Sequence, residues 1–390
     1  MINMAFKLSL IYITIYGGIA AFLPYLTPYL QQRGLSYTQI GIALAVNSMV
    51  ALISQPLWGF FTDKYLNKRL TLLILLLICS LTVYSLIFAT SFFYILLSII
   101  VVIFFQSSII PIIDAYTYEI ISTHNQIQYG RIRMMGSIGF AVTALAVGYV
   151  IKQYGIYSSY IIYSILMLTG LYFVYSINFK PTVRIRKASV QDFIELIKDK
   201  RFILFMISVA IFNIAMGIHS TYIYILIQNT GGDVSILGII FFAMAMSELP
   251  TLFYGDNIVK KFGELNLYKI GVFLFGLRMF INSLISSYML VIVVQMMQSV
   301  TFAFYLLGAL QYINNITKAE VKTSAITFFS AMIGLGAFIG NIGGGILLEH
   351  ISIFALYKIS AVISVIAGVI VVILKRYETK NIVKTTTIIR

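Results

Sequence analysis

The chain has 390 residues, of which 60% are hydrophobic and only 10% are charged, and its formal net charge is +14. A soluble chain has about 25% charged residues, so the composition excludes an ordinary cytosolic enzyme, a disordered protein and a secreted disulfide scaffold. One cysteine, Cys79, cannot form an internal disulfide. The three histidines (His124, His219 and His350) lie far apart in the chain, so we expect neither a metal site nor a cofactor.

Apolar runs of the length of a membrane span recur along the whole chain. A spanning helix needs about 20 apolar residues, and these runs are apolar on all faces rather than along one stripe. None shows the short alternating pattern of a β-barrel. The sequence therefore predicts an all-α integral membrane protein with twelve transmembrane helices. They are placed near 6–30, 38–61, 70–89, 92–121, 134–151, 157–178, 202–228, 235–257, 267–285, 288–314, 324–348 and 353–374.

The basic residues set the orientation of these spans. With a cytoplasmic N-terminus, 22 of the 27 lysines and arginines fall in cytoplasmic segments. Three fall in outer segments (Arg33, Lys152 and Lys358), and two (Arg133 and Arg278) lie inside spans. Positive charge gathers on the cytoplasmic side of membrane proteins, so both termini are expected there. The excess charge then reflects topology rather than nucleic-acid binding. The first run is too long for a signal peptide and is expected to be a permanent helix.

The only long polar connection, 179–201, divides the spans six and six. It predicts a six-helix bundle over 1–178, a second over 202–374 and a cytoplasmic tail over 375–390. Within the connection, Ser189 and Asp192 are spaced as a capping box that would start a short amphipathic helix on the membrane surface.

The two halves also share residues at an offset of 197. The matched pairs are Gly41 with Gly238, Gly139 with Gly336, Gly148 with Gly345 and Tyr160 with Tyr357. Repeated halves are typical of secondary transporters, whose solute site lies at the midplane between them.

The loop between spans 2 and 3 carries the sharpest local motif, formed by Gly59, Asp63, Lys64, Lys68 and Arg69. It resembles the major facilitator loop signature G-x-x-x-D-[RK]-x-x-x-[RK]-[RK]. A glycine allows a neighbouring helix to approach closely, and the charges suit helix ends and anionic lipid. We expect this cluster to act as a cytoplasmic gate.

Four ionisable residues lie inside predicted spans: Asp114, Arg133, Glu248 and Arg278. Such residues are costly in lipid and mark a functional site by default. Each half contributes one acid and one base, so pairing between them would be the least costly arrangement. A structural ion pair is the alternative. Glu119 lies near a span end and is expected to be interfacial.

Further motifs resemble the lactose permease (oligosaccharide:proton symporter) branch of the major facilitator superfamily and the related phenylpropionate-permease-like transporters. The resemblance covers nearly the whole chain. It rests on Gln55–Gly59, Pro111–Ala115, Tyr129–Phe140, Ser247–Leu249, Leu277–Met279 and Gly334–Ile353.

The resemblance implies roles for individual residues. Asp114 falls on the family's sugar-binding carboxylate, Arg133 on its partner arginine and Phe140 on its stacking tryptophan. Glu248 falls on a substrate-linked acid and Arg278 on a proton-coupling arginine.

The chain also departs from that family. The span 10 histidine and glutamate fall on Gln298 and Thr301, and buried charges of spans 7, 10 and 11 fall on neutral residues. Galactoside specificity is thus not supported, and Glu248 or Asp114 would have to carry the proton. Asp114 and Arg133 would bind the solute from one half, and Glu248, Arg278 and Gln298 would close on it from the other.

Three further residues of the spans are weaker candidates. His219 suits a proton relay, because its unperturbed pKa is about 6.5, or else a plain hydrogen-bonding role. Tyr16 and Tyr25 of span 1 could line the solute path. Pro24 and Pro28 are expected to bend or break that span near its outer end.

Together these features predict the major facilitator fold, with two pseudo-symmetric six-helix bundles in a bacterial plasma membrane. We expect a monomeric secondary active transporter that moves a small polar solute (a sugar, nucleoside or aromatic acid) by alternating access with protons. An efflux antiporter for drugs or metabolites and a non-transporting sensor are the alternatives. No constellation of nucleophile and base points to an enzyme, and we expect no nucleic-acid partner.

Overall fold

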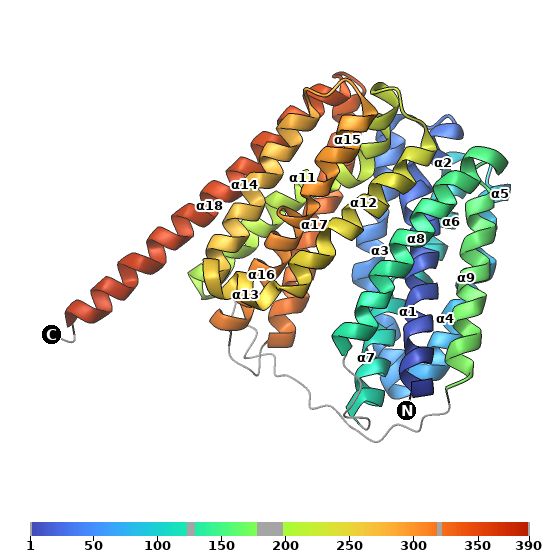
Figure 1. The fold of residues 1–390 in the computed structure, drawn as a ribbon, viewed down its shortest axis with the longest axis horizontal. Helices are drawn as coiled ribbons and strands as arrows, with labels where there is room; N and C mark the ends of the chain where they lie inside the picture. The colour runs from blue at the N-terminus through green and yellow to red at the C-terminus, as the bar shows by residue number, and fades with distance from the viewer. Residues whose placement is uncertain (1, 123–128, 178–197, 318–321, 389–390) are drawn as a thin grey trace. The chain divides into compact units, whose positions relative to one another are not determined.

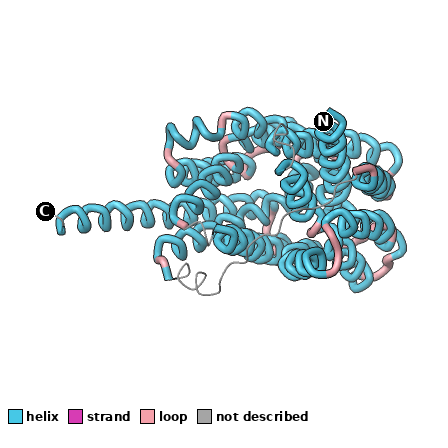
Figure 2. Tube along the Cα trace, turned by 90° about the horizontal axis from the view of Figure 1, so that it is seen from below, coloured by secondary structure: helices cyan, strands magenta, loops and turns pink. Residues whose placement is uncertain are grey.

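The computed structural model describes residues 2–122, 129–177, 198–317 and 322–388. In these ranges the chain is helical apart from short turns, with no strand (Figure 2). The predicted all-α class is therefore confirmed. The short helix expected after Ser189 and the side chain of His124 lie outside the described residues.

The chain divides into two compact units, and the first holds residues 1–185 together with 231–246. Within it α1 packs mainly on α8 and α9 (Figure 1). The helices of this unit are α1 (Ile2–Phe22), η1 (Leu23–Tyr25), α2 (Leu26–Gln32), α3 (Tyr37–Lys64), α4 (Lys68–Thr82), α5 (Ser85–Phe88), α6 (Phe92–Gln106), α7 (Ile109–Ser122), α8 (Tyr129–Tyr154) and α9 (Ser158–Tyr175), with the first part of α12 (Val234–Phe253).

The second unit holds residues 186–230 and 247–390. Within it α11 packs mainly on α17 and α18. Its helices are α11 (Lys200–Asn229), the rest of α12, α13 (Gly255–Phe262), α14 (Glu264–Asn282), α15 (Tyr288–Gln295), η2 (Met296–Ser299), α16 (Phe302–Ile316), α17 (Lys322–Leu348) and α18 (Ile353–Ile388).

Eleven helical segments of the described chain are long and apolar enough to cross a membrane, so the protein is a multi-pass membrane protein. The ninth expected span, α14, is not among them. Its 19 residues include Glu264, Lys269 and Arg278, and such charges lower the hydropathy on which a span is recognised. The count of twelve thus stays a prediction.

Several predicted spans are interrupted, among them the first, the fourth and the tenth. The first has a 3-10 turn at Leu23–Tyr25 with Pro24 at its start, as expected for a residue that lacks an amide hydrogen. The fourth divides into α6 and α7, and the tenth into α15, η2 and α16. The last two breaks were not predicted. They matter because α7 carries Asp114 and η2 carries Gln298.

The internal repeat is visible in the packing of each unit. In the first, a Cβ added at Gly139 of α8 would lie 2.5 Å from the Ile13 carbonyl oxygen of α1. In the second, a Cβ added at Gly336 of α17 would lie 2.2 Å from the Ala210 carbonyl oxygen of α11. Gly139 and Gly336 are 197 residues apart, and so are Ile13 and Ala210, so the offset found in the sequence is confirmed.

A tyrosine hydrogen bond repeats at the same offset. The Tyr25 hydroxyl donates to the Ala144 carbonyl oxygen at 2.6 Å. The Tyr222 hydroxyl donates to the Asn341 carbonyl oxygen, also at 2.6 Å. Each half therefore uses one buried tyrosine to fix two equivalent helices.

The division into units differs from the predicted boundary at 179–201, because the first part of α12 groups with the N-terminal helices. Gly238 explains this grouping: a Cβ there would lie 2.4 Å from the Ala144 carbonyl oxygen of α8. Lys152 and Asp233 add an exposed ion pair of 2.8 Å. Burial opposes ionisation of Asp233, but hydrogen bonds from Lys152 and Ser235 outweigh it and hold its pKa below the usual range.

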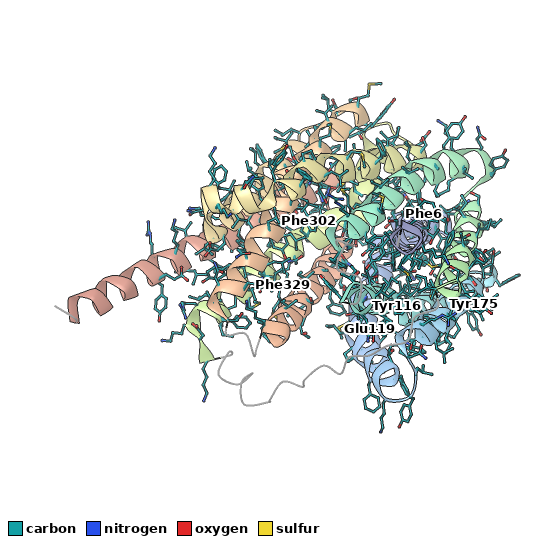
Figure 3. All side chains as sticks on the ribbon, turned by 60° about the horizontal axis from the view of Figure 1, so that its bottom comes forward. Phe6, Tyr116, Glu119, Tyr175, Phe302 and Phe329 are labelled. Atoms are coloured by element: carbon teal, nitrogen blue, oxygen red, sulfur yellow. The ribbon has the colours of Figure 1, made fainter. Side chains whose placement is uncertain are left out.

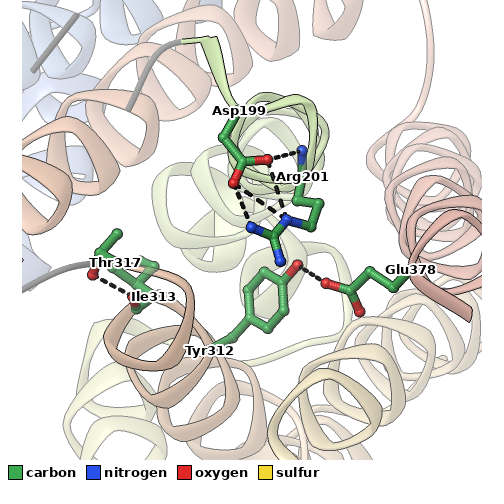
Figure 4. Close-up of polar contacts among 6 residues, drawn as sticks. All are labelled: Asp199, Arg201, Tyr312, Ile313, Thr317 and Glu378. Carbon is green, nitrogen blue, oxygen red and sulfur yellow. Dashed lines mark hydrogen bonds and ion pairs between the residues drawn. The ribbon is translucent and has the colours of Figure 1, made fainter. Parts of the chain in front are cut away.

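One end of the second unit is tied together by a polar cluster (Figure 4). Asp199 begins α11 and pairs with Arg201 at 2.7 Å. Burial opposes ionisation of Asp199, but hydrogen bonds from Arg201 outweigh it and lower its pKa. Beside this pair, the Tyr312 hydroxyl of α16 donates to a Glu378 carboxylate oxygen of α18 at 2.6 Å. The cluster thus anchors α16, whose other end adjoins Gln298.

We expect Tyr312→Phe to lower the stability of the protein by about 1.5–3 kcal/mol, because a hydrogen bond to a charged group contributes about that much. Thermal unfolding in detergent measures it. The control is Tyr377→Phe on α18, where the tyrosine is exposed. Equal melting temperatures for the two variants would show that the Tyr312–Glu378 bond does not anchor α16.

Candidate functional site

Asp114 of α7 lies in a group of tyrosines in the first unit. The Tyr12 hydroxyl of α1 donates to Asp114 Oδ1 at 2.6 Å, and Tyr129 of α8 also hydrogen-bonds this carboxylate. The ring of Tyr129 stacks on Tyr118 with centroids 4.2 Å apart. Three helices therefore converge on one carboxylate. A carboxylate can accept about four hydrogen bonds, so acceptor capacity remains for a solute.

Arg133 of α8 lies over the ring of Tyr16, with its guanidinium carbon 4.3 Å from the ring centroid. This is cation–π distance. Gly136, one turn later, makes room, since a Cβ there would lie 2.8 Å from the same ring. Tyr16 also stacks on Tyr12, with ring centroids 6.0 Å apart. The Tyr16 hydroxyl is buried without a hydrogen-bond partner among the described residues.

Asp114 and Arg133 are thus joined through stacked tyrosines. Among the described residues no salt bridge involves either of them. The expectation that intramembrane charges pair directly is not met in this unit. A carboxylate and a guanidinium that do not neutralise each other can bind the acceptors and donors of a polar molecule separately.

Phe140 and Tyr25, the other candidates of this unit, take different positions. Phe140 meets Phe241 edge to face, with ring centroids 6.1 Å apart, so its ring is partly occupied by an aromatic partner. Tyr25 is 1% exposed and its hydroxyl is engaged by the Ala144 carbonyl oxygen. In this structure Tyr25 fixes helices rather than lining a path.

Arg278 of α14 is the most buried candidate of the second unit, with 0% exposure. It donates through Nη1 to Gln298 Oε1 and to Thr301 Oγ1, the latter at 3.1 Å. It donates through Nη2 to Gln295 Oε1 and to His219 Nε2, the latter at 3.3 Å. All four partners are neutral acceptors.

Glu248 of α12 is half-buried. It interacts with the side chain of Gln298 and, electrostatically, with the guanidinium of Arg278. The structure therefore brings together Glu248, Gln298, Arg278 and His219, which the sequence had nominated separately. They come from four helical segments: α12, η2, α14 and α11.

Three residues of these groups were missed as site candidates. Tyr12 holds Asp114, Gln295 holds Arg278, and Tyr357 holds His219 Nδ1 at 3.1 Å. Tyr12 could have been found, because it lies one helical turn before Tyr16. Tyr357 had appeared only as a repeat partner of Tyr160.

The loop motif between α3 and α4 is engaged in contacts within the first unit. Lys68 forms a salt bridge of 2.9 Å with Glu119 of α7. Arg69 donates to the Tyr175 carbonyl oxygen at the end of α9, and Lys64 lies 5.1 Å from the ring centroid of Phe60. Figure 3 labels Glu119 and Tyr175. Glu119 is a paired and nearly buried side chain, and its expected place at the membrane interface stays a prediction.

The close approach of a helix to Gly59 is not seen among the described residues of the first unit and stays a prediction. A Cβ added there would meet nothing within 4 Å, so no described helix of the first unit requires its small size. The side chain of Asp63 lies outside the described residues.

Comparison with known proteins gives one family over most of the chain. The sequence model of the MFS_1 like family matches residues 5–359. The "Uncharacterized transporter YwbF" of Bacillus subtilis (strain 168) is 28% identical over 95% of this chain and 93% of its own length. The maltose permease of Geobacillus stearothermophilus is 26% identical over 95% and 94%.

The fold has a close counterpart among solved structures. The crystal structure of the nucleoside transporter NupG matches with a TM-score of 0.85 and 17% sequence identity, over 96% of this chain and 100% of that one. At this identity the likeness concerns the fold. The resemblance to major facilitator transporters is confirmed by these matches.

Proposed function

The chain belongs to the MFS_1 like family and is a transporter of the major facilitator type, and from this we propose that it carries a sugar or a nucleoside by proton-coupled symport. Its relatives are transporters rather than enzymes. The proposal includes alternating access by a monomer with twelve spans, α14 being the ninth, in a bacterial plasma membrane with both termini cytoplasmic.

The proposed solute class rests on the arrangement of side chains around Asp114. Sugars and nucleosides both present neighbouring hydroxyl groups, and a carboxylate with free acceptor capacity can bind two of them. Arg133 and the unpartnered Tyr16 hydroxyl supply the donors that ring and hydroxyl oxygens need. The ring of Phe140 offers an apolar face against which a sugar ring or a base can stack.

The names of similar proteins point the same way. A maltose permease and a nucleoside transporter share the fold or sequence of this chain, and a pentose or hexose ring is common to their named solutes. Glu248 is the proposed proton carrier, with His219 and Asp114 as the alternatives. The loop residues Lys68 and Arg69, with Asp63, are the proposed gate.

Uptake into proteoliposomes tests the proposal. Purified protein is reconstituted with an alkaline interior, and radiolabelled uridine, maltose and phenylpropionate are offered in turn. We expect accumulation of uridine or maltose that a protonophore abolishes. Accumulation of phenylpropionate alone would overturn the solute class, and uptake that ignores the proton gradient would overturn symport. Accumulation that instead requires an acidic interior would identify an antiporter, and binding without movement would identify a sensor.

Glu248→Gln should abolish gradient-driven accumulation and preserve exchange of labelled for unlabelled solute. Glutamine keeps the size and hydrogen bonds of the side chain but cannot release a proton, so solute still crosses while the gradient no longer drives it. The matched control is Glu264→Gln in the same unit, where the carboxylate accepts from Asn315 at 3.1 Å in an exposed setting.

The coupling assignment has a clear negative result. If Glu248→Gln and Asp114→Asn both accumulate solute as the unaltered protein does, neither carboxylate carries the proton. Loss of both accumulation and exchange in Glu248→Gln would instead place Glu248 in solute binding.

A further inference from the structure

The guanidinium of Arg278 is almost saturated by its own protein. It has five N–H donors and cannot accept a hydrogen bond. The four hydrogens on Nη1 and Nη2 are directed to Gln298, Thr301, Gln295 and His219. Only Nε–H lacks a partner among the described residues, and it is buried. Little of this side chain is left to bind a solute.

Because arginine only donates, it dictates how its partners are oriented. Each glutamine must turn its carbonyl oxygen toward Arg278 and its NH₂ group away. Gln295 does so, since its Nε2 donates to Asn282 Oδ1 at 3.2 Å. Gln298 interacts on its other side with Glu248, to which its NH₂ group can donate. Arg278 therefore acts on Glu248 indirectly, because it orients the Gln298 amide that can donate to the Glu248 carboxylate.

The same reasoning fixes the tautomer of His219. Its Nε2 accepts from Arg278 and so carries no hydrogen. In the neutral ring the hydrogen then lies on Nδ1, which faces the Tyr357 hydroxyl at 3.1 Å. His219 is 3% exposed. A second proton on Nε2 would break the bond to Arg278 and place two cations side by side.

We propose that Arg278 is a positioning residue, which fixes the Nδ1–H tautomer of His219 and the orientations of Gln295 and Gln298 instead of contacting the solute. One part of the inference rests on the proposed function: that Gln298 positions Glu248, the proposed proton carrier. It removes His219 from the set of proton carriers and leaves Glu248 with a fixed donor.

The internal repeat supplies a comparison within the chain. At the offset of 197, His219 corresponds to Phe22 and Tyr357 to Tyr160. The rings of Phe22 and Tyr160 pack with centroids 6.2 Å apart, and those of His219 and Tyr357 with centroids 5.9 Å apart. The first unit thus uses this position for packing alone, so His219→Phe is a variant that the fold accommodates once already.

Nitrogen NMR on the full-length protein with ¹⁵N-labelled histidine tests the proposal without any solute. The chain has only three histidines, and the spectrum of His219→Phe identifies the signals of His219 by their loss. At neutral pH we expect one tautomer, with Nδ1 protonated and Nε2 unprotonated. A protonated Nε2 would overturn the proposal, whether the ring is neutral or charged.

Variants then show whether Arg278 sets this state. Arg278→Lys keeps a donor at Nε2 and should retain the tautomer. Arg278→Met removes the donor, so a second signal set with Nε2 protonated should appear. Tyr357→Phe should leave Nε2 unprotonated, because Arg278 still donates to it. A switch of tautomer in Tyr357→Phe, or none in a folded Arg278→Met protein, would assign control to Tyr357 and overturn the proposal.

Melting curves in detergent establish which variants are folded. If Arg278→Met does not fold, the spectra of the unaltered protein and of Tyr357→Phe still decide the question. A failure to find uridine or maltose transport would leave these spectra unaffected, so the two proposals fail separately.

Discussion

Asp114→Asn is expected to lower the kcat/KM of uridine or maltose uptake about 10- to 100-fold. A hydrogen bond to a charged group contributes about 1.5–3 kcal/mol, and each 1.4 kcal/mol corresponds to about a factor of ten. The substitution removes the charge and presents an NH₂ group, which cannot accept, on one side of the carboxamide. Initial rates at several solute concentrations measure the loss.

Two further variants show whether the charge of Asp114 itself is responsible for the loss. The Tyr12 hydroxyl donates to Asp114 at 2.6 Å, so the variant also disturbs the stack of Tyr12 on Tyr16. Tyr12→Phe should therefore cause a smaller loss than Asp114→Asn, because it leaves the charge in place. The control is Asp233→Asn, an exposed carboxylate before α12 that pairs with Lys152.

Two results would contradict the role of Asp114. One is unchanged kcat/KM in Asp114→Asn, and the other is a loss in Asp233→Asn as large as that in Asp114→Asn. A melting curve separates lost transport from lost folding.

The charges inside the spans were predictable from sequence, while their partners were not. Asp114, Arg133, Glu248 and Arg278 stand out because charge is rare in apolar segments. The sequence suggested that they neutralise one another. Arg278 instead donates to the side-chain amides of Gln295 in α15 and Gln298 in η2. It also donates to the hydroxyl of Thr301 and the imidazole of His219 in α11. Such partners are ordinary polar residues, and only the packing of helices far apart in the chain selects them.

The repeat could be predicted from the sequence, but the break between α6 and α7 and the grouping of α12 could not. An offset of 197 follows from comparing identical residues such as Gly139 and Gly336, and the structure shows both against an equivalent backbone. The break between α6 and α7 lies just before Pro111, which has no amide hydrogen to donate to the Ser107 carbonyl oxygen. That oxygen accepts from the Gln55 side chain instead, at 3.1 Å. The grouping of α12 with the first unit depends on the approach of Gly238 to Ala144, a contact between segments 94 residues apart.

Gly59 shows that a motif can be recognised before the physical reason for each of its residues is seen. Its residues match a loop signature, and Lys68 and Arg69 do contact α7 and α9. The glycine itself, however, has open space where a Cβ would lie. A sequence pattern identifies which residue occurs at a position, but the neighbour that would require a small residue is a property of the packed structure.

Gly336→Ala is expected to destabilise the second unit by about 1–3 kcal/mol or more, the usual cost of overpacking. A Cβ at this position would lie 2.2 Å from the Ala210 carbonyl oxygen and 2.7 Å from the Asn213 Cβ. Because one of these atoms belongs to the backbone of α11, the clash cannot be relieved by turning a side chain. The two helices must move apart along their main contact.

Gly343→Ala in the same helix is the matched comparison, since a Cβ there meets nothing within 4 Å. Alanine is favoured over glycine within a helix by about 0.5–1 kcal/mol, so this variant should melt at the same or a higher temperature. The same chemical change is therefore expected to act in opposite directions at two positions of α17. Equal shifts in melting temperature would mean that helix propensity, rather than the contact between α11 and α17, governs both positions.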